Sequence, residues 1–148
     1  MSTGARLVAS AIASLLLASS AATAPAFAAP TTSASSCSGS NCAGKSPVTT
    51  TCERTARTVR RTAEIGPLLE LRYSSTCRAA WVRVTHARGG DRIEARNKGG
   101  SCRHPSCYAK TVASGHSTAY TAMVNDKGIK AWACLERRNG NIVCTESY

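Results

Sequence analysis

The stretch Leu68-Leu-Glu-Leu-Arg-Tyr-Ser-Ser-Thr-Cys-Arg-Ala-Ala-Trp-Val-Arg-Val-Thr85 contains two alternating segments on either side of a short polar turn. In residues 68–73, Leu69, Leu71 and Tyr73 occupy every second position. In residues 78–85, small and branched apolar side chains alternate with Trp81, Arg83 and Thr85. Alternation of this kind is typical of half-buried β-strands, so we predict two strands joined by the turn at residues 74–76.

The chain after residue 51 contains further short segments of this kind, bounded by Gly, Pro, Asn and Ser. We predict further strands at residues 52–65, 92–96, 107–112, 118–124, 129–137 and 141–145. A short helix remains an alternative for residues 52–65, and in residues 118–124 we expect Tyr120, Ala122 and Val124 to share a face. Short strands with frequent turns predict an all-β fold, an antiparallel sandwich or small barrel.

The last predicted hairpin turns at Asn139-Gly140 and allows a sharper prediction. A two-residue loop would place Cys134 opposite Thr145, whereas a three-residue loop with Gly140 in the left-handed conformation places it opposite Cys144. Directly opposed residues of a non-hydrogen-bonded pair have Cα atoms about 4.5 Å apart, which is within disulfide range. We therefore predict a Cys134–Cys144 disulfide and a bulge at Gly140.

The first 28 residues have the features of an export signal. Arg6 precedes an apolar stretch, and Ala26-Phe27-Ala28 fits the small-x-small pattern of a signal peptidase site. The apolar stretch is shorter than the ~20 residues that a membrane-spanning helix needs. We predict a signal peptide at 1–28, a flexible lead-in at 29–36 and a disulfide-rich domain at 37–148. The product is expected to be secreted, without a stable membrane span, and either released or held at the cell surface only by its own charge.

The chain contains eight cysteines, all of them after the predicted signal peptide. An even number in a small exported domain predicts a disulfide framework. The disulfides are needed to stabilise the fold, because no Phe follows residue 28 and few large aromatic side chains are available to fill a core. Besides Cys134–Cys144, we favour one pair that ties the first long segment to the turn before Trp81 and two pairs by proximity: Cys52–Cys77, Cys37–Cys42 and Cys102–Cys107.

The net charge of the whole chain is +11, and without Arg6 it has 18 basic and 8 acidic residues. Such a surface favours polyanions, among them cell-wall polymers, extracellular polymers and, without specificity, nucleic acid. A compositional bias towards Arg is the alternative explanation. Candidate anion contacts are Arg72, Arg78 and Arg83, with Trp81 as a stacking platform. We favour the alternative that Trp81 lies in the core, because so few large side chains are available to fill it.

Residues 70–84 resemble the central motif of the YjfA-like family, small exported bacterial proteins that form a domain-of-unknown-function family. Residues 37–47 followed by Cys52 resemble the Cys-rich entry of that family, although Ser46 stands where the family usually has an acid. Residues 119–124 resemble a later family strand. The resemblance implies export and a disulfide-bonded domain, and it implies no reaction.

Catalytic chemistry finds little support in the sequence. A hydrolytic site would need a nucleophile beside a histidine that a carboxylate orients, and only His86, five residues before Asp91, and the loop residue His116 offer a start. Cys102, His104 and Cys107 have the composition of a zinc site, but an exported thiol pair is more simply a disulfide. We expect no catalytic residue, cofactor or metal.

The favoured function is a non-enzymatic exported domain that contacts anionic envelope or extracellular polymers. The alternatives are a secreted inhibitor or antibacterial effector that displays a loop such as residues 97–106, and a small hydrolase.

Overall fold

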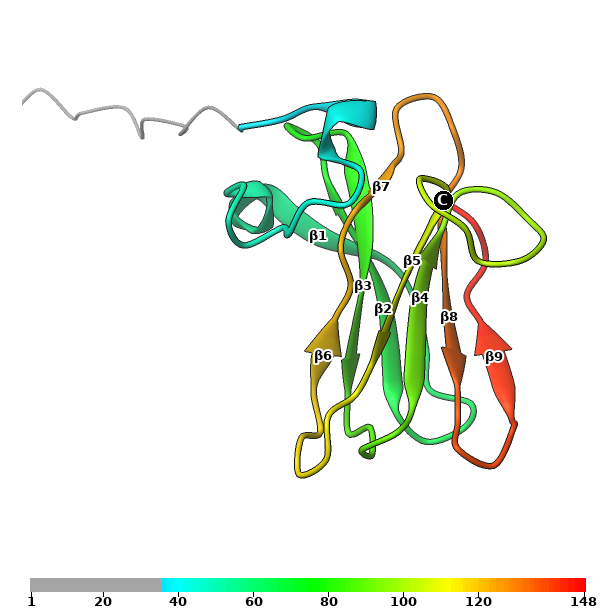
Figure 1. Ribbon diagram of the computed structural model, residues 1–148. Helices are drawn as coiled ribbons and strands as arrows, with labels where there is room; N and C mark the ends of the chain where they lie inside the picture. Colours follow the sequence, from blue (N-terminus) through cyan, green and yellow to red (C-terminus); the bar gives the residue numbers. More distant parts are fainter. Residues whose placement is uncertain (1–35) are drawn as a thin grey trace, which may run out of the picture. The chain divides into compact units, whose positions relative to one another are not determined.

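The computed structural model describes residues 36–148, which form two antiparallel sheets packed face to face (Figure 1). The first sheet contains β1 (Ala56–Thr62), β2 (Leu68–Ser74) and β3 (Ala79–Thr85), and β3 also pairs with the short strands β6 (Ala119–Tyr120) and β7 (Val124–Asn125). The second sheet has the order β5 (Cys107–Thr111), β4 (Arg92–Arg96), β8 (Trp132–Glu136) and β9 (Ile142–Cys144). The predicted all-β antiparallel sandwich is confirmed.

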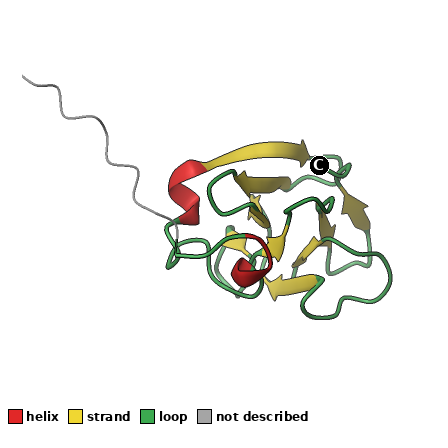
Figure 2. Cartoon of the chain, turned by 90° about the horizontal axis from the view of Figure 1, so that it is seen from above, coloured by secondary structure: helices red, strands yellow, loops and turns green. Residues whose placement is uncertain are grey.

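The predicted signal peptide and most of the lead-in lie outside the described residues. Two 3-10 turns, η1 (Gly39–Cys42) and η2 (Cys52–Thr55), precede the first strand and lie at one side of the sandwich when it is seen from above (Figure 2). No helix within residues 36–148 has both the length and the apolar character needed to cross a bilayer.

The main core lies between the two sheets and is built from the alternating positions of the strands. The first sheet contributes Leu69, Leu71, Ala80, Val82 and Val84, all fully buried. The second sheet contributes a matching row from β4 and β8: Ile93, Ala95, Ala133 and Leu135. The alternation in the stretch 68–85 therefore predicts the core face correctly.

The opposite face of β3 carries Trp81, which packs in a second, smaller cluster. The side chain is only 4% exposed, and it belongs to one buried cluster with the first four cysteines, Ala79 and Met123. The Cys-rich segment before β1 thus covers the outer face of the first sheet. Trp81 is buried as favoured, but beneath this segment rather than between the sheets.

The strand predicted at residues 129–137 is shorter in the structure, where β8 begins only at Trp132, and two other predicted strands differ in kind. The segment at residues 52–65 begins as the 3-10 turn η2 and becomes the strand β1 only at Ala56. The segment at 118–124 is split into β6 and β7, because the side chain of Thr121, instead of a backbone carbonyl, accepts a hydrogen bond from β3. The hydroxyl Oγ1 of Thr121 accepts the Val82 amide at 3.1 Å.

The break also changes which side chains are buried. Met123 leaves β3 and pairs instead with the backbone of Gly44 and Lys45, at 2.9 and 3.0 Å. The expected common face of Tyr120, Ala122 and Val124 is therefore wrong. Val124 enters the main core, whereas Tyr120 is 40% exposed.

The outer edge of the first sheet is β1, whose pairing with β2 is interrupted by an irregularity between Thr58 and Arg60. Val59, at this irregularity, packs against the main core. Exposed Arg57 and Arg61 flank the same region. The edge strand is thus both bulged and basic.

The closing hairpin has the three-residue register. Cys134 pairs with Cys144, with a Cα–Cα distance of 4.1 Å, and Gly140 has a φ of 86°. The eight cysteines of the described region form four disulfides, in the pairs that the sequence favours: Cys37–Cys42, Cys52–Cys77, Cys102–Cys107 and Cys134–Cys144.

Candidate anion-binding site

Three connections meet at one end of the sandwich, the lower end in Figure 1. They are the β1–β2 loop at residues 63–67, the β3–β4 turn at 86–91 and the β8–β9 hairpin loop at 137–141. The β3–β4 turn fits closely beneath the hairpin, because a Cβ atom added at Gly90 would lie 2.5 Å from Cδ of Arg138. Gly90 also has a φ of 93°, a conformation that L side chains rarely adopt.

Asp91 is the centre of this arrangement and is only 1% exposed. Its Oδ2 accepts the Arg88 amide at 2.8 Å, and its Oδ1 accepts Nε of Arg137 at 3.1 Å and the Arg138 amide at 3.4 Å. Arg137 is fixed further because it donates to the Ile65 carbonyl at 2.5 Å. One buried carboxylate therefore joins all three connections.

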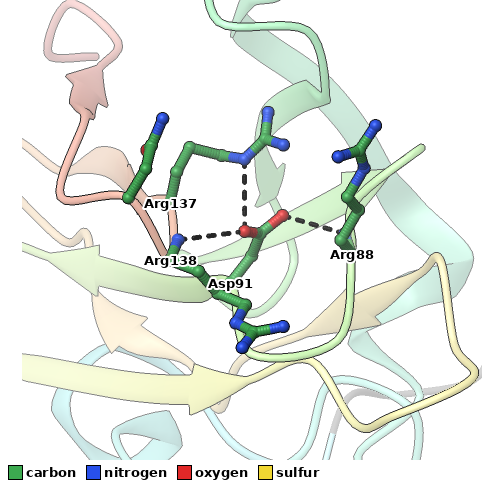
Figure 3. A pocket seen from close by; sticks show the side chains of 5 residues that line it. Arg88, Asp91, Arg137 and Arg138 are labelled. Carbon is green, nitrogen blue, oxygen red and sulfur yellow. Dashed lines mark hydrogen bonds and ion pairs between the residues drawn. The ribbon is translucent and has the colours of Figure 1, made fainter.

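The hollow beside Asp91 has a volume of about 350 Å³ and is lined by Arg88, Asp91, Arg137, Arg138 and Asn139. Figure 3 shows Asp91 bonded to the side chain of Arg137 and to the backbone of Arg88 and Arg138. Arg88 and Arg138 are exposed and Arg137 is half-buried. Because three arginines and a single acid line it, the hollow retains positive charge. Guanidinium groups bind phosphate and carboxylate through paired hydrogen bonds, so the hollow is suited to an anion.

Replacing Asp91 with Asn is expected to lower the free energy of unfolding by about 2 kcal/mol, because the buried Arg137 pairing loses its charge. Chemical denaturation of the two proteins at neutral pH measures the change. Glu64→Gln is the matched control, since Glu64 is exposed. Equal stability of the Asp91 and Glu64 variants would contradict a structural role for this carboxylate.

Of the anion contacts suggested by the sequence, Arg72, Arg83 and Trp81 line one hollow of about 230 Å³ on the outer face of the first sheet. Arg78 does not line it and lies in the turn before β3. The indole of Trp81 is mostly covered, which leaves little of its ring open for stacking.

Glu70 partly neutralises this outer-face hollow. Its Oε2 lies 2.7 Å from Nη2 of Arg83, and its Oε1 accepts the Thr58 hydroxyl at 2.8 Å. Burial acts to raise the pKa of Glu70, but hydrogen bonds from Arg83 and Thr58 and the charges of Arg83 and Arg72 outweigh it, so the pKa is lowered. Burial, then the charge of Arg83, lowers the pKa of Arg72.

All three histidines, His86, His104 and His116, are exposed. His86 is exposed, and its Nδ1 lies 3.4 Å from the Thr85 hydroxyl, while the carboxylate of nearby Asp91 is bonded to Arg88, Arg137 and Arg138. The exposed ring of His104 stacks on Tyr108 at 4.4 Å.

Two groups of close sulfur and carboxylate atoms have the spacing of metal ligands within residues 36–148. Their cysteines are all joined in disulfides, so they offer no thiolate. The Cys102 and Cys107 sulfurs are bonded to each other, which is the simpler of the two interpretations of that motif.

Sequence reasoning missed Arg88, Arg137 and Arg138 as a group. The stretch 88–91 looks like an ordinary turn, and Arg137 and Arg138 belong to a hairpin nearly fifty residues later. The available signal was an acid inside a Gly-Gly turn followed by an Arg-Arg pair in another turn. It becomes meaningful only once the topology places both turns at one end.

Comparison with known families gives one match. Residues 40–134 match the sequence profile of a family described as "Protein of unknown function (DUF2690)". No curated protein and no solved structure shows significant similarity to the chain. The matched segment runs from η1 to β8 and includes both Asp91 and Arg88. The chain therefore belongs to the DUF2690 family of proteins of unknown function.

Proposed function

We propose that this protein is an exported, non-enzymatic domain that binds anionic polymers of the cell envelope or the surroundings. The observation that carries the proposal is the hollow that Arg88, Arg137 and Arg138 line together with one buried carboxylate, that of Asp91. Asp91 holds Arg137 in place before any ligand arrives, which reduces the entropy lost on binding. The proposal includes export from the cell and membership of the YjfA-like family. The four disulfides support both, since disulfides are typical of exported proteins.

The surrounding charge supports the same function. The chain has 19 basic and 8 acidic residues, and four of the acids are paired with arginines: Glu70, Asp91, Glu94 and Glu136. Much of the acidic charge is therefore neutralised locally, and the excess basic charge attracts polyanions from a distance. The hollow then supplies the directional contacts that long-range attraction lacks.

The test compares two double variants that lose the same net charge. Arg88→Gln/Arg138→Gln empties the hollow of its exposed guanidinium groups and leaves Asp91–Arg137 intact. Arg61→Gln/Arg103→Gln removes two exposed arginines elsewhere. The first is expected to weaken binding to a soluble teichoic acid about tenfold or more, because each charge-assisted hydrogen bond is worth about 1.5–3 kcal/mol. The control is expected to weaken it less than threefold.

Titration calorimetry at several salt concentrations measures both effects, and heparin serves as a sulfated comparison. The affinity of the wild-type protein is expected to fall steeply with salt. An equal loss in the two double variants would show that only total charge matters and would overturn the assignment to this hollow. Absence of binding to either polymer at low salt would overturn the function.

A second candidate function is suggested by the loop at residues 97–106. The Cys102–Cys107 disulfide closes it, and hydrogen bonds from Arg96 to the Gly100 carbonyl and from Asn97 to the Ser106 carbonyl hold its backbone. A fixed, exposed loop is the form in which inhibitors present themselves to proteases. Stoichiometric, saturable inhibition of a secreted serine protease would support this function, and a panel without any inhibition would dismiss it.

A further inference from the structure

Asp126 differs from the other buried carboxylates of the described region. It is 9% exposed, and its Oδ2 is fully buried without a hydrogen-bond partner among residues 36–148. Glu70, Asp91 and Glu94, by contrast, all accept hydrogen bonds from arginine side chains. A buried polar atom left unpaired destabilises a fold by about 1–3 kcal/mol, so its presence calls for an explanation outside the protein's own contacts.

Asp126 lines a hollow of about 220 Å³ at the opposite end of the sandwich from Arg137, together with Tyr73, Gly128, Ile129, Lys130 and Tyr148. The rings of Tyr73 and Tyr148 form a pair with centroids 5.1 Å apart. Tyr148 is held by backbone pairing with Ala131 and by a 2.8 Å hydrogen bond from Arg57 to its hydroxyl. The hollow thus combines aromatic surface with an unpaired acceptor.

The surrounding charges decide between classes of ligand. Lys130 lines the hollow, Arg57 bonds to the Tyr148 hydroxyl, and Arg60 lies 5.5 Å from the Tyr148 ring centroid. These cations disfavour an ammonium ligand, and the Asp126 carboxylate disfavours an anion. A neutral polyol meets neither obstacle, since its hydroxyls donate to the carboxylate and its C–H face packs on a tyrosine ring.

We propose that this hollow binds a neutral saccharide unit, with Asp126 accepting its hydroxyls and the tyrosine pair packing against its ring. Burial raises the pKa of Asp126 to about 7, which lets the group either accept or donate near neutrality. The site is distinct from the arginine hollow, so each can be tested while the other is intact.

The ligand extends beyond one sugar. Ile129 is 45% exposed and lines both this hollow and a larger one of about 430 Å³. The larger hollow carries polar groups from Asn97, Ser106 and Asn125. Two adjoining hollows that share an exposed apolar side chain suit consecutive units of an oligosaccharide.

The experiment titrates the oxidised protein with soluble oligosaccharides and follows amide shifts of Asp126, Gly128 and Ile129 by NMR. The probes are two neutral tetrasaccharides, one of N-acetylglucosamine and one of glucose, and the fully deacetylated, cationic form of the first. Saturable binding of a neutral tetramer is expected, at least tenfold tighter than that of its disaccharide or of the cationic form. No shifts at millimolar concentration, or tighter binding of the cationic form, would overturn the proposal.

Two variants localise the site. Asp126→Leu removes both acceptor oxygens and is expected to weaken binding about tenfold or more. Ile129→Arg changes an exposed residue, so folding is unaffected, and it is expected to abolish the preference for the tetramer. Tyr120→Ala, which alters an exposed tyrosine on another face, is the matched control. Unchanged binding in both site variants would place the saccharide elsewhere and refute the assignment.

Discussion

Replacing Asp126 with Asn is expected to stabilise the protein at pH 8, by up to about 4 kcal/mol, and to change its stability little near pH 4. Burial raises the pKa of Asp126 from 3.8 to about 7 in the folded protein. The folded state therefore keeps a proton that the unfolded chain releases at lower pH. Stability from this group is fully present below about pH 4 and is lost as the pH rises through about 7.

The comparison between variant and wild type is essential because other acids act in the opposite direction. Glu70 has a lowered pKa, so its contribution is present above its unfolded value of 4.5 and is lost in acid. The difference between the two proteins cancels such terms. Urea denaturation at pH 4.5 and pH 8 measures it, with the exposed Glu64→Gln as control. A difference that does not change with pH would show that the carboxyl of Asp126 titrates normally.

Removal of the Cys52–Cys77 disulfide is expected to cost about 3.5 kcal/mol, more than removal of any other. Its sequence separation of 25 is the largest of the four, and the entropy that a crosslink removes from the unfolded chain grows with loop length. Both cysteines are fully buried in the cluster that covers Trp81. The double variant Cys52→Ala/Cys77→Ala should therefore also shift tryptophan fluorescence to longer wavelength.

The control for this experiment is Cys134→Ala/Cys144→Ala. The sequence separation of that pair is 10, for which the same relation gives about 2.7 kcal/mol, and it lies in the other sheet, away from the Trp81 cluster. Denaturant unfolding gives the two free energies. If the Cys52–Cys77 variant were the more stable, or if only the control shifted the fluorescence, the role of this crosslink in holding the cover over Trp81 would be wrong.

The sequence predicted the parts of the fold that depend on local patterns. Alternation in residues 68–85 identified the core face, and counting residues around Gly140 found the register of the last hairpin. The prediction for residues 118–124 was wrong because the Thr121 hydroxyl accepts the hydrogen bond from the Val82 amide. Met123 then pairs with the N-terminal segment instead of with β3. The alternation of apolar and polar residues gives no sign that a side chain will replace a backbone group as a hydrogen-bond partner.

The candidate sites were harder to predict for a related reason. Arg72 and Arg83 lie on the neighbouring strands β2 and β3, two residues apart in register, and do line one hollow. Glu70, the cross-strand partner of Arg83, accepts a hydrogen bond from it and takes up part of this positive charge. The arginine hollow depends on two turns that meet only through the topology of the sandwich. The distinctive property of Asp126 is a missing partner, which a sequence cannot display.

The bulged, basic edge formed by β1 bears on how copies of the protein behave towards one another. An exposed sheet edge is where a second chain can add its own strand and begin a fibril. Here the irregularity between Thr58 and Arg60 breaks the row of backbone groups that such a strand would need. Two molecules approaching along this edge would also oppose arginine to arginine. This edge is thereby a poor template for the addition of a second strand.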